Sequence, residues 1–283
     1  MNSAIGLAVG RSSVRVPRPT VFGRILFRWC PVRRAVVLEN MRRVFPGFDD
    51  RELRVLAECF YSHFGRSLFE MLRMSWMTDS EIRRHIRVEG KENLQRAAEL
   101  GRGILILTGH FGSWEFAPVA AILGWPQYRG RFHFIRKSLG RVLESVLFGR
   151  FERAGLGVIP KRGGLDRILD ALAKNDAVAF LLDQHASPSS TGIAVEFFGR
   201  PAGTNRSLAM IAALSGAPVV PATSYRRPDG DHVMEFHPAI PWIHRDDPQD
   251  EIRENTRRYN QVLERFVLAH PEQWFWFHRR WKL

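Results

Sequence analysis

The sequence predicts an α/β protein in which a mixed, largely parallel sheet is flanked by helices and preceded by a helical N-terminal cap. From residue 88 onward, short apolar runs alternate with segments of helical periodicity, an order typical of sheets covered by helices. The runs Ile104–Leu107 and Ala177–Leu182 contain no polar residue, which is typical of strands buried on both faces.

The N-terminal part is predicted to be helical. In Val21–Val44 arginines interleave with large apolar residues, and Pro31 divides the segment into two helices. Asp49 and Asp50 mark the start of a long helix, because acidic residues stabilise a helix N-terminus. A short helical segment follows Thr78. We therefore expect a basic amphipathic helical region at 1–85, continuous with an α/β part at 86–283.

The alternating part is predicted element by element from the spacing of its apolar residues. We expect, in chain order, helix 91–100, strand 103–108, helix 112–123, strand 131–136, helix 140–154, strand 157–159, helix 164–174, strand 177–182, helix 204–215, strand 218–225, strand 232–237 and a helix over about 250–269.

The composition indicates a folded protein that favours polyanionic partners. The chain has 283 residues, of which 45% are hydrophobic, and a formal net charge of +13. Such a charge favours nucleic acid, an anionic membrane surface or an acidic carrier protein. Cys30 and Cys59 are the only cysteines, so a zinc knuckle and a disulfide framework are both excluded, and a reducing compartment is expected.

The sequence contains no run of about 18 apolar residues, so we expect no transmembrane helix. The N-terminus also lacks the order of charge, apolar core and cleavage site of a secretory signal. The basic, Trp- and Phe-rich segment Val21–Val44 suits the headgroup region of an anionic membrane. The alternative is a helix packed on the protein with a solvated arginine face.

The stretch ILILTGHFGSWEFAPV places a histidine and a glutamate around a glycine turn. His110 follows a predicted strand, and ligands gather at the carboxyl ends of strands in α/β sheets. Amides near Gly112 and Ser113 are candidates to stabilise an oxyanion. Glu115 is expected to orient the imidazole, so that it activates a substrate hydroxyl or water. The alternative is a hydrogen-bonded polar pair at a strand end.

Two further groups of polar residues follow predicted strands. Asp183, Gln184 and His185 come after the run VAFLL. A metal site built from His110, Glu115, Asp183 and His185 is conceivable on ligand type but is disfavoured, because no ligand spacing supports it. Basic pairs follow two other strands and suggest recognition of a phosphate or an acidic group, although a solvated face is the alternative. These pairs are Arg136 with Lys137, and Lys161 with Arg162. We expect no metal and no cofactor.

With these residues identified, the chain resembles the late acyltransferases of lipid A biosynthesis, within the lysophospholipid acyltransferase superfamily. Three segments carry the resemblance. Together with Asn40, Phe45-Pro46 and Glu70 nearer the N-terminus, they extend it over roughly residues 35–283. They are GHFGSWE at 109–115, which fits a His-x4-(Asp/Glu) signature, LDQHASPSSTGIAVEFFGRPAGT at 182–204, and PEQWFWFHRRWK at 271–282.

The resemblance implies transfer of an acyl chain from an acyl carrier protein thioester, or from acyl coenzyme A, to a hydroxyl of a phosphorylated glycolipid. It implies His110 as general base with Glu115 as its partner. Arg136 and Asp183 match positions beside the family's site, and we count them with Gly112 and Lys137 as substrate-binding candidates. Family members typically carry an N-terminal transmembrane anchor. Arginines and a proline interrupt Val21–Val44, so this segment is not expected to span a membrane. It predicts peripheral attachment at the cytoplasmic face of the inner membrane.

Several alternatives remain open from the sequence. Sister branches of the family acylate other glycolipids, including phosphatidylinositol mannosides. A hydrolase would use the same base to activate water. A non-enzymatic basic protein that binds membrane or nucleic acid would explain the charge, but the chain has no recognisable nucleic-acid-binding motif and we expect no nucleic-acid partner. Acyl chain length, acceptor hydroxyl and oligomeric state are not predicted.

Overall fold

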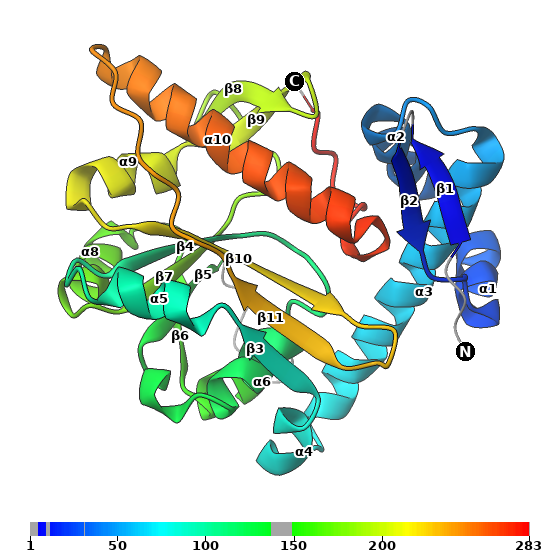
Figure 1. Cartoon of the computed structure of the whole chain (residues 1–283), viewed down its shortest axis with the longest axis horizontal. Helices are drawn as coiled ribbons and strands as arrows, with labels where there is room; N and C mark the ends of the chain where they lie inside the picture. The colour runs from blue at the N-terminus through cyan, green and yellow to red at the C-terminus, as the bar shows by residue number, and fades with distance from the viewer. Residues whose placement is uncertain (1–4, 10–11, 31, 137–148, 283) are drawn as a thin grey trace.

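A seven-stranded sheet lies at the centre of the computed structural model, which describes residues 5–9, 12–30, 32–136 and 149–282 (Figure 1). In spatial order its strands are β3 (Ile86–Glu89), β11 (His232–Phe236), β10 (Val219–Arg226), β4 (Ile104–Thr108), β7 (Ala177–Leu181), β5 (Phe132–Arg136) and β6 (Leu156–Pro160). Neighbouring strands are parallel except β10 and β11, which are antiparallel. The predicted mixed, largely parallel sheet flanked by helices is confirmed.

Helices cover both faces of the sheet. Successive residues of a strand point to opposite faces, so a strand that is apolar throughout needs a layer of helices on each face to bury it. Leu105 and Leu107 of β4 belong to one hydrophobic core, whereas Ile104 and Ile106 belong to a second. The first core includes helices α8 (Leu165–Ala173), α9 (Ser207–Ser215) and α10 (Pro248–Ala269). The second core includes α5 (Lys91–Ala98) and α6 (Phe116–Leu123), which lie on the other side of the sheet (Figure 1).

The N-terminal helices pack against this α/β part. They are α1 (Val21–Trp29), α2 (Arg34–Val44), α3 (Asp50–Met74) and α4 (Asp79–Arg83). Helix α3 begins at a capping box in which Asp49 and Glu52 each accept a hydrogen bond from the other's backbone N–H. Leu53, Leu56 and Phe60 of α3 join the same core as β4 and α10. Within the described ranges, no helix combines the length and apolar character needed to span a membrane.

Two hairpins were not predicted: β1 (Ile5–Val9) with β2 (Ser12–Val16), and β8 (Gly192–Phe197) with β9 (Arg200–Asn205). The expected helix 204–215 begins only at Ser207, because the chain is still a strand at Asn205. Phe198 and Gly199 both have positive φ, 52° and 66°, and form the two-residue turn that joins β8 to β9. Phenylalanine seldom adopts this conformation, so the residues Phe198-Gly199 do not predict a turn of this type.

Smaller differences concern helix boundaries. The expected helix 112–123 begins at Phe116, and β3 was not predicted. Of the expected helix 140–154, residues 149–154 are helical and the remainder lies outside the described residues. Two short 3-10 helices cover Pro126–Tyr128 and Pro271–Gln273. The second of these precedes the C-terminal segment, which returns to the carboxyl ends of β4 and β7.

Candidate active site

A histidine and an aspartate meet at the carboxyl ends of β4 and β7. The two strands are parallel neighbours whose last paired residues are Thr108 and Leu181, and His110 and Asp183 each lie two residues further along. The Nδ1 atom of His110 lies 2.9 Å from Oδ1 of Asp183. The backbone N–H of His110 donates to Oδ2 of Asp183 at 2.9 Å. The register of the sheet therefore sets the spacing of this pair.

The Asp183 carboxylate fixes the tautomer of His110. Asp183 is only 2% exposed, and its Oδ2 accepts a further hydrogen bond of 2.9 Å from Nε1 of Trp274. Burial raises the pKa of Asp183, but the charge of His110 and these donated hydrogen bonds outweigh burial and lower it overall. An ionised carboxylate only accepts hydrogen bonds, so Nδ1 of His110 carries the proton and Nε2 keeps a basic lone pair.

The pKa of His110 is raised overall. Burial alone lowers it, but the charge and hydrogen bond of Asp183 and the charge of Glu115 outweigh this effect. The side-chain nitrogen of Gln184 lies 3.3 Å from Nε2 and 3.4 Å from Nδ1 of His110, so it faces the edge of the ring between the two nitrogens. His110 thus has the orientation and the basicity of a general base.

Glu115, the expected partner of His110, acts from a different position. Helix α6 begins at Phe116, so Glu115 lies in the turn before the helix. Asp183 occupies Nδ1 of His110, and no hydrogen bond joins Glu115 to His110 among the described side chains. Burial raises the pKa of Glu115 to about 7, against the opposing charges of Arg136 and His110. Glu115 therefore couples to His110 through charge and not through a direct hydrogen bond.

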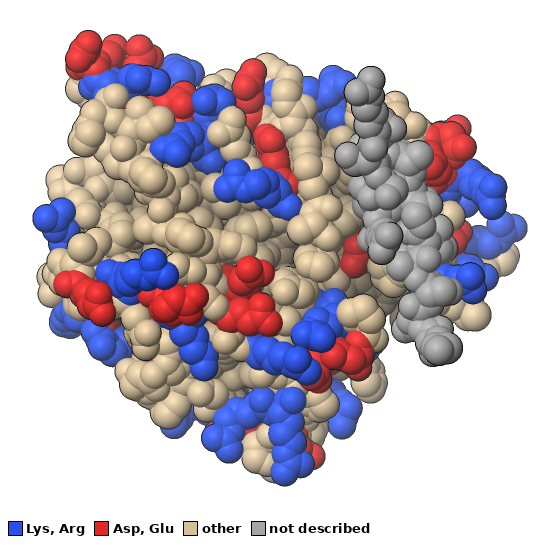
Figure 2. Space-filling view, in the orientation of Figure 1, with Lys and Arg blue, Asp and Glu red and all other residues tan. Residues whose placement is uncertain are grey.

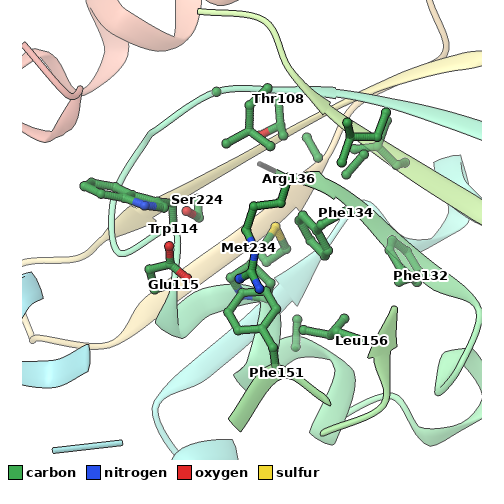
Figure 3. Close-up of a pocket in the computed structure, with 18 of the residues that line it drawn as sticks. Thr108, Trp114, Glu115, Phe132, Phe134, Arg136, Phe151, Leu156, Ser224 and Met234 are labelled. Carbon is green, nitrogen blue, oxygen red and sulfur yellow. The ribbon is translucent and has the colours of Figure 1, made fainter. Parts of the chain in front are cut away.

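An apolar cavity of about 470 Å³ begins at these residues and extends between the sheet and α6. We call it the acyl-sized cavity. Apolar side chains from several strands and from α6 form most of its wall, including Ile106, Ile122, Trp125, Phe132, Phe151 and Leu156. Figure 3 shows the Arg136 side chain inside the cavity, with Glu115 on one side and Phe134 and Phe151 close by. The cavity is therefore apolar along its wall and carries charged groups at one end.

Of the remaining predicted site residues, some line the acyl-sized cavity and others do not. Arg136 is the last residue of β5 and lines the acyl-sized cavity, as does Lys161 after β6. Lys137 lies outside the described residues. The backbone N–H of Gly112 donates to the carbonyl of Gln273 at 2.9 Å, so this amide is already occupied. Gly112 has a φ of +58°, and a Cβ there would lie 2.5 Å from the carbonyl oxygen of Ser224. Its role is to let the turn pass close to β10.

A buried polar network beneath the turn was not predicted. Glu70 of α3 accepts hydrogen bonds from Arg226 and, at 3.0 Å, from Ser113. His232 lies 3.3 Å from the same carboxylate, and His63 lies 3.1 Å from the carbonyl oxygen of Gly112. Burial raises the pKa of Glu70, but hydrogen bonds from His232 and Arg226 lower it overall to about 2. Glu70 is thus ionised and ties α3 to the turn that carries His110.

His110 has the geometry of a base, whereas the nearby hydroxyl of Ser113 does not have the geometry of a nucleophile. The hydroxyl of Ser113 donates to Glu70 and is 3% exposed, so Ser113 is not available to attack a substrate. Within the described ranges, no group of three or more His, Cys, Asp or Glu side chains is arranged to hold a metal ion. The geometry suits removal of a proton from a substrate hydroxyl beside an apolar chain.

Comparison with known proteins shows which family the chain belongs to. Residues 6–283 match the family described as bacterial lipid A biosynthesis acyltransferase. The chain belongs to this family. It is similar to the lipid A biosynthesis palmitoleoyltransferase and lauroyltransferase of Escherichia coli K12, with 28% and 26% identity respectively, each alignment covering 98% of this chain and 90% of the relative. It is also similar to a phosphatidylinositol mannoside acyltransferase of Mycobacterium tuberculosis, with 23% identity, over 77% of this chain and 67% of the relative.

The lipid A acyltransferase family accounts for the resemblance carried by the three sequence segments, and that prediction is confirmed. The protein is an acyltransferase. Membership of the family leaves the non-enzymatic alternative without support.

Proposed function

We propose that the protein transfers a fatty acyl chain from an acyl carrier protein thioester to a hydroxyl of a lipid A precursor. The observation that supports this proposal best is the His110–Asp183 pair at the charged end of an apolar cavity of about 470 Å³. An apolar wall favours an acyl chain, because each buried methylene contributes about 0.8 kcal/mol. With the chain in the cavity, its thioester lies among the charged groups.

In the proposed reaction, Nε2 of His110 removes the proton of the acceptor hydroxyl as its oxygen attacks the thioester carbonyl carbon. The carbonyl oxygen becomes an oxyanion, which the positive charge of Arg136 stabilises. Collapse of the tetrahedral intermediate breaks the carbon–sulfur bond, and the imidazolium returns the proton to the departing thiolate. Asp183 keeps Nδ1 protonated, and Glu115 adds a second negative charge that stabilises the imidazolium.

The test is transfer by the purified protein from an acyl carrier protein thioester to a lipid A precursor, followed by mass spectrometry. We expect His110→Ala to lower kcat by about 10²- to 10⁴-fold, the usual contribution of a general base. His133→Ala is the matched control, because His133 also pairs with an aspartate, Asp176, but at the opposite end of β7. Equal kcat values in wild type and His110→Ala would refute the proposed base. Release of free fatty acid in place of transfer would identify a hydrolase.

A phosphatidylinositol mannoside is the second candidate acceptor. The observation in its favour is the similarity to the mycobacterial relatives of that name. The His110–Asp183 geometry suits a hydroxyl of either glycolipid, so product analysis must distinguish them. Mass spectrometry of glycolipids from a deletion strain would identify the acceptor as the lipid that lacks one acyl chain.

The N-terminal helices support a proposed attachment to an anionic membrane surface at the cytoplasmic face. α1, α3 and the turn after α3 expose large apolar side chains, among them Phe22 at 55%, Trp29 at 74%, Phe69 at 63% and Trp76 at 81% exposure. We call these the lipid-facing strip; it also includes Val21, Ile25, Val32, Leu68 and Leu72. Figure 2 shows lysine and arginine side chains gathered at the right-hand edge, where Figure 1 places α1. Apolar side chains flanked by cations favour an anionic bilayer.

Vesicle sedimentation tests this attachment. We expect Trp29→Glu and Phe69→Glu each to weaken binding to vesicles that contain anionic lipid. Leu214→Glu is the matched control, because Leu214 of α9 is 68% exposed but lies outside the lipid-facing strip. Equal loss of binding in all three variants would refute the assignment of the strip.

A further inference from the structure

A second cavity, of about 570 Å³, lies between the start of α2 and the C-terminal segment. We call it the basic cavity, because its polar lining consists of Arg33, His185, His278, Arg279 and Lys282. Within the described part of the chain, no aspartate or glutamate lies within ion-pairing distance of Arg33, Arg279 or Lys282. Cationic side chains that share a cavity without a carboxylate favour an anionic ligand.

The backbone at the start of α2 adds to this preference. Ala35 and Val36, in the first turn of this helix of 11 residues, line the same cavity. The residue before the helix, Arg33, makes no side-chain hydrogen bond that caps the helix. An uncapped helix N-terminus has free N–H groups and a partial positive charge, and both favour phosphate. The helix end and the basic side chains therefore favour the same ligand.

The basic cavity is held by buried contacts. Asn40, which is 2% exposed, donates to the carbonyl oxygens of Trp276 and His278 at 2.9 and 2.8 Å and so fixes the C-terminal segment on α2. Arg33 donates to the carbonyl oxygen of Phe277 at 3.1 Å. The neighbour of Arg279 in the sequence, Arg280, is fully buried and donates to Gly203 and Thr204. Arg280 thus has a structural role, whereas Arg279 remains exposed at the cavity.

The basic cavity adjoins the proposed active site through three consecutive residues. Asp183 holds His110, Gln184 lines the acyl-sized cavity, and His185 lines the basic cavity. The backbone N–H of His185 donates to Nδ1 of His278 at 3.3 Å, which joins the segment after β7 to the C-terminal segment at the cavity. A ligand in the basic cavity is therefore close to the base, on the other side of this short segment from the acyl chain.

We propose that the basic cavity binds a phosphate monoester of the glycolipid acceptor and so places the acceptor hydroxyl at His110. This inference rests on the proposed function. Arg33 follows directly after the exposed Val32, which belongs to the lipid-facing strip, so the cavity lies beside the surface from which a membrane lipid would enter. The acyl donor has a separate apolar cavity for its chain. The basic cavity is therefore assigned to the acceptor and not to the donor.

The test compares two acceptors and two double variants of the full-length protein. The acceptors are a phosphorylated glycolipid and the same lipid without its phosphates. Arg279→Gln/Lys282→Gln removes two exposed cations from the basic cavity, and Arg102→Gln/Lys174→Gln removes two exposed cations that line neither cavity. We expect the first variant to raise KM for the phosphorylated acceptor by about tenfold or more, because a hydrogen bond to a charged group contributes at least about 1.4 kcal/mol.

KM for the dephosphorylated acceptor and KM for the acyl donor should stay within about twofold of wild type in both variants. A rise in KM for the donor would assign the basic cavity to the donor and overturn the proposal. Equal effects on the two acceptors, or equal effects of the two double variants, would also overturn it. Failure of the wild type to acylate either lipid would refute the proposed function itself, and this result is distinct from normal transfer without phosphate dependence.

Discussion

Replacement of Asp183 by asparagine tests the base most directly, because the contacts of this carboxylate determine the orientation of the new amide. Oδ2 of Asp183 accepts hydrogen bonds from the His110 backbone and from Trp274, both at 2.9 Å. The single oxygen of asparagine must remain at this position to satisfy both donors. Its NH₂ group then faces Nδ1 of His110, where Oδ1 lies in wild type. Nδ1 must accept a hydrogen bond, so the proton moves to Nε2 and the base loses its lone pair.

We expect Asp183→Asn to lower kcat by about 10³- to 10⁴-fold, since the imidazole is held in the wrong tautomer. Initial rates are measured from pH 5 to 9 at saturating substrates. In wild type, activity should rise with pH through a pKa above the ordinary 6.5 of histidine, because the pKa of His110 is raised and its neutral form is the base. In the variant this acid limb should disappear together with the activity.

Asp176→Asn is the control for this substitution. Asp176 is also a largely buried aspartate, and it pairs with His133 at 3.0 Å and with Arg131 at 3.1 Å. Asp176 precedes β7, whereas Asp183 follows it. We therefore expect Asp176→Asn to reduce stability without a comparable loss of kcat. A kcat of Asp183→Asn within tenfold of wild type would refute the tautomer argument.

Three further predictions concern the cavity and the turn. Glu115→Gln removes a charge that raises the pKa of His110, so the acid limb of kcat should move to lower pH; an unmoved limb in the pH–rate profile contradicts this. Ala179→Leu narrows the acyl-sized cavity and should lower kcat/KM by about fourfold for each acyl methylene that the cavity no longer holds. Competition between acyl thioesters of different length should then show a preference for shorter chains. An unchanged preference excludes Ala179 from the acyl path. Glu70→Gln should lower the free energy of unfolding at pH 7 by about 3 kcal/mol. Because the pKa of Glu70 is lowered from 4.5 to about 2, this difference should shrink as the pH falls through that range in denaturant titrations, and a constant difference would contradict it.

The central strands were predictable because their burial determines their composition. β4 and β7 are buried on both faces, and only an uninterrupted apolar run satisfies that environment. β9 is not predicted from the sequence, because its residues lie in a local hairpin whose turn requires positive φ at Phe198. Thr204, expected in a helix, is instead a fully buried strand residue bonded to Arg280, 76 positions away. Contacts of that range leave no local periodicity in the sequence.

The residues that gather at the site were predictable from the sequence, but the residue that hydrogen-bonds to His110 was not. His110 and Asp183 follow strands of a parallel sheet and Arg136 ends one, so all three are expected at the same edge of the sheet. Nearness in sequence and a helix that begins at residue 112 predict Glu115 as the partner of His110. The spatial order β4–β7–β5 makes Asp183 the neighbour of His110, and strand order cannot be read from hydrophobic pattern. The basic cavity joins residues near 33, 185 and 280 and was hidden for the same reason.

Helix α3 relates the base to the proposed membrane surface. His63, Ser67 and Glu70 are spaced four and three residues apart, so they lie on one stripe of the helix, and this stripe contacts the turn that follows His110. Phe69 and Leu72 form a second, exposed stripe that belongs to the lipid-facing strip. A helix with its side chains is about 10 Å across, so one helix diameter separates the turn from that surface. An acceptor anchored in the bilayer could therefore reach the base while its acyl chains stay in the membrane.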